Sequence, residues 1–205
     1  MRQVFSRHII AAISLVFLHG CEQPRLTPLP GDGVILAYGD SLTLGVGAPP
    51  HSSYPMVLAQ LSGRRVVNAG ISGEVTAAGL ARLTRTLEET DPALLVLLEG
   101  GNDILRNESP ATIKRNLAAM IETAADRGVE VVLIGVPEKS LFSKSAPLYG
   151  ELAGQYGLVF EDTLIARLLR TPSYKSDAVH FNQRGYRAMA EAIFELLREN
   201  GALRP

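Results

Sequence analysis

The chain has 205 residues, of which 46% are hydrophobic and 20% are charged, a balance that is typical of a folded domain. This length suffices for one α/β domain with a buried core. The net charge of −1 gives no reason to expect nucleic acid as a partner. The single cysteine, Cys21, excludes an internal disulfide, and without a C-x-x-C or H-E-x-x-H pattern the sequence indicates no metal.

The first 20 residues have the layout of a secretory signal. Basic residues at the start precede an apolar stretch, residues 9–18, which is short for a helix that spans a bilayer. The stretch ends in Leu18-His19-Gly20-Cys21, which resembles the lipobox of bacterial lipoproteins, although His19 stands where a small residue is usual. We therefore expect a lipoprotein-type signal peptide over 1–20 and lipidation of Cys21. An ordinary signal peptide or an uncleaved anchor is the alternative.

These features predict an exported protein that is anchored to a membrane through lipid and faces the periplasm or the cell exterior. The next segment is rich in proline and glycine, so residues 21–32 are interpreted as a tether. The folded domain is expected to occupy residues 33–205.

Five apolar runs have the length of β-strands, and segments with helical patterns separate them. The strands are expected at residues 34–37, 65–69, 94–98, 129–136 and 158–160. The helices are expected at about 55–61, 75–88, from about Pro110 to Gly128, up to about Tyr156, weakly at 163–169, and after a cap at Asn182. This alternation predicts a three-layer α/β/α fold with a doubly wound, mostly parallel sheet of about five strands.

Ser41 lies where the first predicted strand ends and a helical turn can begin, within Tyr38-Gly39-Asp40-Ser41-Leu42. Free backbone N–H groups and the helix dipole favour negative charge at such a point. A serine hydroxyl there is well placed to attack a carbonyl, with its own N–H directed at the oxyanion that forms. Taken alone, Asp40-Ser41 is more commonly a helix cap.

Other polar groups are expected at the same edge of the sheet. Gly73 and Asn102 follow the second and third strands, and ligands of such sheets bind beyond the carboxyl ends of the strands. His180 follows Asp177 by three residues, positions that share a face in a helical turn, so the carboxylate can orient the imidazole. His51 has no acid beside it and is expected at the surface.

Four sequence blocks, in this order, resemble the SGNH (GDSL) hydrolase family. They are Gly39-Asp40-Ser41-Leu42, Asn68-Ala69-Gly70-Ile71-Ser72-Gly73, Gly100-Gly101-Asn102-Asp103 and Asp177-Ala178-Val179-His180. Their order and spacing look most like the bacterial thioesterase I/lysophospholipase and arylesterase branch, which implies a flavodoxin-like sheet. The resemblance implies Ser41 as nucleophile, His180 as base and Asp177 as its partner. It also implies an oxyanion hole made by the N–H groups of Ser41 and Gly73 and the side chain of Asn102.

The chain departs from the family pattern at two positions. Phe181 follows the histidine where the family usually has proline, which concerns the rigidity of the loop more than the chemistry. Glu99 stands where this branch is expected to have an apolar residue, and we interpret it as hydrogen-bonded structure or as a group that tunes the site. The α/β-hydrolase pattern G-x-S-x-G is absent, so Ser72 is a poor rival nucleophile.

The resemblance implies two-step acyl transfer on a small-molecule or lipid ester or thioester, without cofactor or metal. The apolar part of the substrate is expected against Ile104-Leu105 and Leu141-Phe142. A carbohydrate O-acetylesterase is the first alternative and would have an open polar cleft. A non-catalytic binding lipoprotein is the second. The sequence does not indicate the oligomeric state, the acyl-chain length or the physiological substrate.

Overall fold

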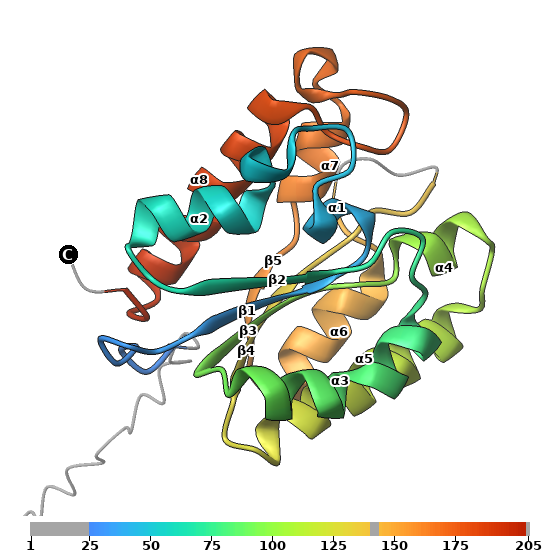
Figure 1. Ribbon diagram of the computed structural model, residues 1–205. Helices are drawn as coiled ribbons and strands as arrows, with labels where there is room; N and C mark the ends of the chain where they lie inside the picture. Colours follow the sequence, from blue (N-terminus) through green and yellow to red (C-terminus); the bar gives the residue numbers. More distant parts are fainter. Residues whose placement is uncertain (1–24, 140–143, 204–205) are drawn as a thin grey trace, which may run out of the picture.

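A five-stranded parallel sheet with strand order β2-β1-β3-β4-β5 forms the centre of the computed structural model, which describes residues 25–139 and 144–203 (Figure 1). The strands are β1 (Ile35–Gly39), β2 (Val66–Gly70), β3 (Leu94–Leu98), β4 (Glu130–Ile134) and β5 (Val159–Glu161). All four pairings are parallel. The predicted doubly wound sheet is therefore confirmed, and each strand lies within about two residues of its predicted bounds.

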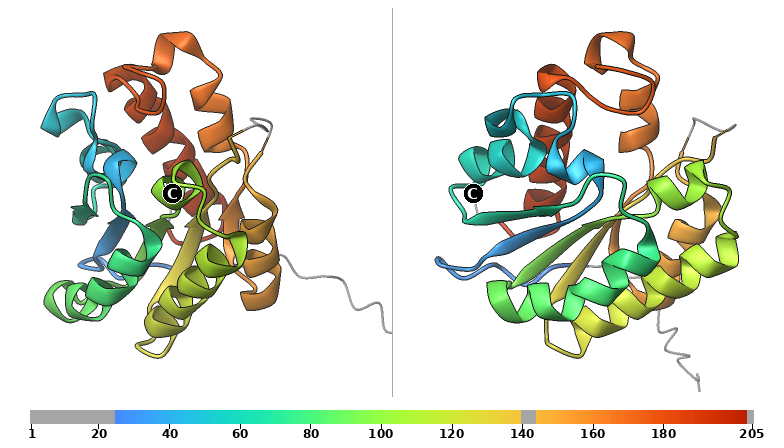
Figure 2. Two further views of the ribbon diagram at one scale, coloured as in Figure 1. Left: turned by 90° about the vertical axis from the view of Figure 1, so that its right-hand side faces the viewer. Right: turned by 45° about the vertical axis from the view of Figure 1, so that its right-hand side comes forward.

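Helices cover both faces of the sheet and make the outer layers (Figures 1 and 2). Helices α2 and α8 pack together on one face, whereas α3, α5 and α6 lie side by side on the other. The α-helices are α1 (Ser41–Leu44), α2 (Tyr54–Ser62), α3 (Thr76–Thr90), α4 (Gly101–Leu105), α5 (Pro110–Ala125), α6 (Pro147–Tyr156), α7 (Leu164–Leu169) and α8 (Gln183–Glu199). Two short 3-10 helices are η1 (Pro50–Ser52) and η2 (Pro172–Tyr174).

The core lies between these layers, and β3 is at its centre. Every residue of β3 is fully buried, because helices cover both faces of this middle strand. The last helix, α8, begins after Asn182, whose side-chain oxygen accepts a hydrogen bond of 3.1 Å from the Gly185 N–H. The predicted cap is therefore confirmed, and it satisfies one of the free N–H groups of the first turn.

The pairing register brings the carboxyl ends of three strands to one edge. Gly39 at the end of β1 pairs with Gly70 of β2 on one side and with Leu98 of β3 on the other. The chain leaves β1 towards β2 and later returns to β3, so the strand order reverses between β1 and β3. Such a switch point is where doubly wound sheets bind ligands.

Residues 25–32 differ from the tether expected there, because they pack on the domain. The side chains of Leu26 and Leu29 are buried in the core. Their N–H groups donate to the carbonyls of Asn200 and Ala202, each at 2.9 Å. The segment runs across the amino edge of the sheet, where the Thr27 N–H donates to the Glu130 carboxylate at 3.0 Å. The free energy gained by burying the two leucines offsets the conformational entropy that is lost when the segment is ordered. This loss is already reduced by the prolines, which restrict the backbone.

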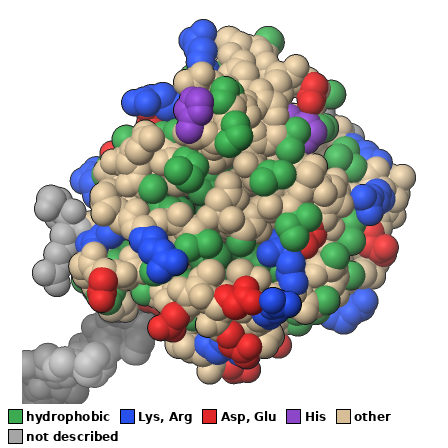
Figure 3. All heavy atoms as spheres, viewed as in Figure 1, with side chains coloured by type: hydrophobic (Ala, Val, Ile, Leu, Met, Phe, Trp, Pro, Cys, Tyr) green, Lys and Arg blue, Asp and Glu red, His purple; other side chains and the backbone are tan. Residues whose placement is uncertain are grey.

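The signal peptide expected over 1–20, Cys21 and the pair Leu141-Phe142 lie outside the described residues. In the part of the chain that is described, no helix is long and apolar enough to cross a membrane. On the face drawn in Figure 3, basic and acidic side chains are interspersed, and hydrophobic side chains lie between them.

Candidate active site

Ser41 is the first residue of α1, directly beyond the end of β1. The turn is tight, because a Cβ added to Gly39 would lie 2.1 Å from the Leu98 carbonyl oxygen. Asp40 caps α1 by accepting a hydrogen bond of 2.9 Å from the Leu42 N–H. With only four residues, α1 has a small dipole. The free N–H of Ser41 therefore contributes more than the dipole to stabilising a negative charge at this helix end.

The structure brings Ser41, His180 and Asp177 into one chain of contacts, although 139 positions separate the serine from the histidine. Ser41 Oγ lies 3.0 Å from His180 Nε2. On the other side of the ring, His180 Nδ1 lies 2.7 Å from Asp177 Oδ2. Nδ1–H therefore donates to the carboxylate, which leaves Nε2 free to accept the serine proton.

The loop that carries His180 forms a bend instead of the expected helical turn. Asp177 Oδ1 accepts the N–H groups of Val179 and His180, each at 2.8 Å, so the carboxylate organises its own loop. Phe181, which stands where the family usually has proline, is fully buried and packs edge-on against Tyr186 with ring centroids 5.6 Å apart. This anchor fixes the end of the loop next to the imidazole.

These hydrogen bonds change the acidity of Asp177. Partial desolvation acts to raise its pKa, but the hydrogen bonds from the His180 ring and from the Val179 and His180 N–H groups lower the pKa to about 2. The carboxylate is therefore ionised throughout the neutral range. It can hold the imidazole in one tautomer and stabilise the positive charge that forms when His180 takes a proton.

The three groups expected to form the oxyanion hole all line one cavity with Ser41 Oγ. Gly73 adopts a φ of 75°, and its carbonyl accepts a hydrogen bond of 3.1 Å from Arg106 Nη2, which fixes the orientation of the loop. The Asn102 amide donates one N–H to Asp40 Oδ2 at 3.2 Å. Because a primary amide has two N–H groups, the second remains available to a ligand.

Asp40 connects the serine turn to the asparagine. Its two carboxylate oxygens accept from Leu42 and Asn102, and only 4% of the residue is exposed. Burial raises the pKa of Asp40 to about 6, although the Leu42 N–H and the charge on His180 act in the opposite direction. The geometry gives Asp40 a role in fixing the two loops.

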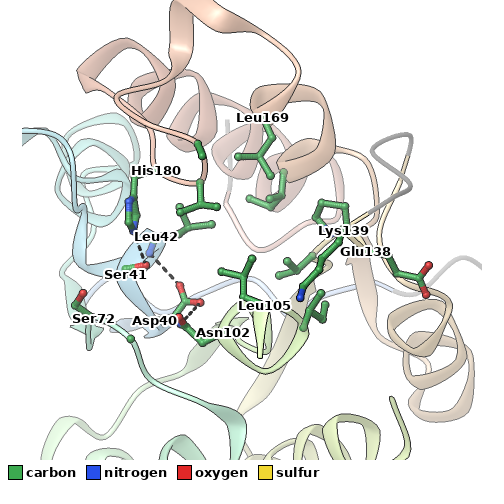
Figure 4. A pocket seen from close by; sticks show the side chains of 18 residues that line it. Asp40, Ser41, Leu42, Ser72, Asn102, Leu105, Glu138, Lys139, Leu169 and His180 are labelled. Atoms are coloured by element: carbon green, nitrogen blue, oxygen red, sulfur yellow. Dashed lines mark hydrogen bonds between the residues drawn. The ribbon is translucent and has the colours of Figure 1, made fainter. Parts of the chain in front are cut away.

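The cavity has a volume of about 460 Å³, and most of its wall is hydrophobic (Figure 4). In Figure 4, His180 points towards Ser41, whereas Leu105 and Leu169 enter the cavity from different elements. Ile104 and Leu105 line it as the sequence predicted. The remaining apolar wall comes from Leu42, Val136, Pro137, Ile165, Leu169, Ala178 and Val179.

Part of this wall, from α7 and from the segment after β4, was not predicted from the sequence. Residues 129–136 are predicted only as a strand and residues 163–169 only as a weak helix, whereas Val136, Pro137, Ile165 and Leu169 line the cavity. The signal that could have found them is position, since both segments adjoin the carboxyl edge where a ligand was expected.

Two other candidates have different surroundings. His51 is exposed in η1 and does not line the cavity, in agreement with the expected surface position. Ser72 does line the cavity, but the imidazole of His180 is hydrogen-bonded to Ser41. Over residues 25–139 and 144–203, no group of three His, Cys, Asp or Glu side chains could hold a metal ion.

Comparison with known families decides the classification. The GDSL-like lipase/acylhydrolase family matches residues 37–188, which include all four sequence blocks of the site. The chain belongs to this family. The resemblance inferred from those blocks is therefore confirmed.

Two curated proteins are similar to this chain over part of its length. "Esterase TesA" of Pseudomonas aeruginosa is 39% identical over 127 residues, or 59% of this chain and 63% of that protein. "Arylesterase" of Vibrio mimicus is 36% identical over 107 residues, or 50% of this chain and 54% of that protein. The chain thus spans less than two thirds of the length of these two relatives.

Two solved structures share the fold over more of the chain. The crystal structure of TesA superposes with a TM-score of 0.73 and 28% identity, covering 82% of this chain and 99% of the other. AlinE4, described as an SGNH-hydrolase family esterase, superposes with a TM-score of 0.65 and 31% identity, covering 82% and 96%.

Proposed function

We propose that this protein is a serine esterase that hydrolyses carboxylic esters or thioesters through an acyl-enzyme. The observation that carries the proposal is the hydrogen-bonded chain Ser41–His180–Asp177 at the wall of an apolar cavity. The names of the relatives, which include an esterase and an arylesterase, also support it.

In the proposed reaction, Ser41 Oγ attacks the carbonyl carbon of the substrate while His180 Nε2 takes the serine proton. The N–H groups of Ser41 and Gly73 and the amide of Asn102 donate to the oxyanion. His180 then gives its proton to the leaving alcohol or thiol. A water molecule, deprotonated by His180, attacks the acyl-enzyme. The bond between the acyl carbon and Ser41 Oγ then breaks, His180 returns the proton to Oγ, and the acid is released. The chain's own residues supply every group that these steps need.

The substrate class follows from the wall of the cavity. Apolar side chains from α4, α7 and the segment after β4 line the space beside Ser41 (Figure 4). We therefore favour a hydrocarbon acyl or alcohol group over a sugar, whose hydroxyls would lose hydrogen bonds to water in such a cavity. The O-acetylesterase alternative requires an open polar cleft. Glu138 and Lys139 also line this cavity, but most of the wall is apolar and therefore favours the hydrocarbon group.

Labelling with a fluorophosphonate tests the nucleophile directly. We expect one adduct on Ser41, with no label and no measurable ester hydrolysis for Ser41→Ala, because the hydroxyl is lost without a change in the core. Ser72→Ala is the matched control, since this serine lines the same cavity, and it should still be labelled. Labelling of Ser41→Ala at the rate of the unaltered protein would reject the proposal. If the unaltered protein forms no adduct at all, the proposal is also wrong, and the alternative of a non-catalytic binding protein is favoured.

We also propose that the protein is exported and held at a membrane by lipid on Cys21. Only residues 22–24 separate Cys21 from Arg25, and residues 26–30 are packed at the amino edge of the sheet. Four extended steps reach about 14 Å at most. A lipid at Cys21 would hold that edge near the bilayer and direct the opposite edge, with Ser41, away from it. This arrangement favours substrates that arrive from solution.

Fractionation after detergent-free lysis tests the anchor. We expect Cys21→Ser to move the protein from the membrane fraction to the soluble fraction, because the residue that would carry the lipid is lost. Its activity on soluble esters should be retained. If the variant stays wholly in the membrane fraction, the apolar segment at 9–18 is the anchor and the lipid proposal is wrong.

A further inference from the structure

Glu99 is a fully buried carboxyl group directly beyond β3, and the proposed reaction does not use it. Its Oε2 accepts a hydrogen bond of 3.2 Å from the Gly100 N–H. Its Oε1 has no hydrogen-bond partner among the described residues. Such a group is rare in a folded protein and requires an explanation.

The neighbouring helix leaves room for this side chain. A Cβ added to Gly79 of α3 would lie 3.3 Å from Glu99 Oε1, so the absence of a side chain at this position creates the space. The backbone on both sides is held by tyrosines. The Tyr38 hydroxyl donates to the Gly79 carbonyl at 2.6 Å, and the Tyr149 hydroxyl donates to the Glu99 carbonyl at 2.7 Å. The carboxyl group therefore occupies a defined place between β3 and α3.

The charges around Glu99 do not favour a further negative charge. The nearby cation, Arg82 of α3, is already engaged, because its Nε donates to Glu74 Oε1 at 2.6 Å and its Nη2 contacts Glu74 Oε2. Asp40, from the turn after β1, is a further acid that acts on Glu99. Burial, followed by the charges of Asp40 and Glu74, raises the pKa of Glu99 to about 10.

A proton on Glu99 accounts for its unpartnered oxygen. The Glu74 side chain raises the pKa of Glu99 both by its charge and by the side-chain hydrogen bond that a proton shared between the two groups would make. As two carboxylates, both groups could only accept hydrogen bonds. As a carboxylic acid, Glu99 becomes a donor, and the Glu74 carboxylate can accept from it and from Arg82 together.

We propose that Glu99 is a neutral carboxylic acid that donates a hydrogen bond to the Glu74 carboxylate and so positions the loops that carry Gly73 and Asn102. Glu74 directly follows Gly73, and Glu99 lies three residues before Asn102. The bond thus joins the two loops from which the oxyanion donors come. The inference rests on the proposed function, since positioning matters only if these donors bind an oxyanion.

Other contacts join the same loops. The Thr76 N–H and hydroxyl donate to Asp103 at 2.8 and 2.6 Å, and Arg106 donates to the Gly73 carbonyl. Loss of the Glu99 proton should therefore misalign the donors without unfolding the site. It would also add a negative charge near the developing oxyanion. Both effects act on the transition state, so kcat should fall more than KM rises.

Infrared difference spectroscopy tests the protonation state without any assay of activity. At pH 8 we expect a C=O stretching band of a protonated carboxylic acid that is missing from Glu99→Gln. The band should persist in Ser41→Ala, so its presence is independent of whether the protein is an esterase. Absence of the band from the unaltered protein at pH 8 would overturn the proposal, whatever the enzyme assays show.

Kinetics test the positioning role. We expect Glu99→Leu, which removes the donor, to lower kcat about 10- to 100-fold with little change in KM. Glu99→Gln, which can still donate to Glu74, should recover most of this loss. As the pH rises towards 10, kcat of the unaltered protein should fall, and that of Glu99→Gln should not follow it.

The matched control is Met120→Leu, an apolar exchange of similar volume beside Gly79, which should leave kcat and its pH dependence unchanged. Equal loss of kcat in Glu99→Leu and Glu99→Gln would refute the positioning role. A decrease of kcat at alkaline pH that is the same in the unaltered protein and in Glu99→Gln would also refute it.

Discussion

At the scale of single residues, Asp40 and Asp177 form the same pattern of hydrogen bonds on the two sides of the proposed nucleophile. Each carboxylate accepts the N–H of a residue shortly after it and also holds a side chain of the site. Asp40 holds the Asn102 amide, and Asp177 holds the His180 ring. One residue thus fixes the local backbone and a distant functional group together.

Asn102→Ala should lower kcat roughly 100- to 1000-fold and leave KM nearly unchanged, because an oxyanion donor acts mainly on the transition state. Steady-state kinetics and a thermal melt on one preparation measure the effect. The melting temperature should stay within a few degrees of the unaltered protein.

Asn116→Ala is the control for the loss of an amide. Asn116 donates a hydrogen bond of 3.0 Å to the Thr76 hydroxyl and does not line the cavity. It should affect stability more than kcat. An Asn102→Ala variant with a raised KM at unchanged kcat, or with a large loss of melting temperature, would assign Asn102 a structural role instead.

Asp177→Asn should lower kcat about 1000- to 10,000-fold, because an amide can hold the imidazole in the wrong tautomer. The pKa of Asp177 is lowered to about 2 from an ordinary value of 3.8, so Asp177 itself should stay ionised and cause no decrease of kcat/KM above about pH 4. By the same shift, ionised Asp177 stabilises the fold above about pH 4, and this contribution is lost as the pH falls towards 2.

The pH–rate profile and a comparison with Asp126→Asn, an exposed acid at the end of α5, test this assignment. Asp126→Asn should behave like the unaltered protein. Retention of a tenth or more of kcat in Asp177→Asn would show that the carboxylate is not needed to orient the histidine.

At the scale of elements, two loops from opposite ends of the chain support each other beside Ser41. Residues 45–49 after α1 lie against the loop 175–181 that carries Asp177 and His180. The Tyr186 hydroxyl of α8 donates to the Val46 carbonyl at 2.7 Å and joins the two. The position of the histidine therefore depends on how α1, α8 and their loops pack.

Gly47→Ala should disturb this packing. Gly47 has a φ of 94°, and a Cβ at this position would lie 2.1 Å from Ser176 Oγ and 2.7 Å from the Phe181 carbonyl oxygen. We expect kcat to fall about 100-fold, since a shift of about 1 Å in His180 has an effect of that size. The backbone strain should also lower the free energy of unfolding by about 1–3 kcal/mol.

Gly154→Ala is the matched control, because Gly154 lies exposed on α6 with no atom within 4 Å of an added Cβ. It should stabilise the protein by about 0.5–1 kcal/mol and leave kcat unchanged. Kinetics and urea denaturation of both variants decide the matter, and equal kcat in Gly47→Ala and Gly154→Ala would contradict the proposed support.

At the scale of the whole molecule, the two edges of the sheet differ in structure and in proposed role. The carboxyl edge carries Ser41 and the cavity, whereas the amino edge is covered by residues 25–32. Because Leu26 and Leu29 are buried, this segment contributes to the stability of the domain and to the direction in which an anchor would leave it.

The double variant Leu26→Ala/Leu29→Ala should therefore lower the free energy of unfolding by about 4 kcal/mol or more, at about 2 kcal/mol for each truncated leucine. Met56→Ala, at a residue 41% exposed on α2, should change it by less than about 0.5 kcal/mol. Urea denaturation measures both. A double variant as stable as Met56→Ala would restore the interpretation of residues 25–32 as a free tether.

The order of the elements and the identity of the residues at the carboxyl edge could be predicted from the amino-acid sequence. Apolar runs such as 94–98 need burial on both faces, and alternation with helices makes the strands parallel, so Ser41, Gly73 and Asn102 had to follow strands at one edge. Features that depend on contacts between distant positions could be seen only in the folded chain. The cavity wall from α7, the docking of Leu26 and Leu29, and the place of Glu99 against Gly79 result from packing, for which local spacing carries no signal.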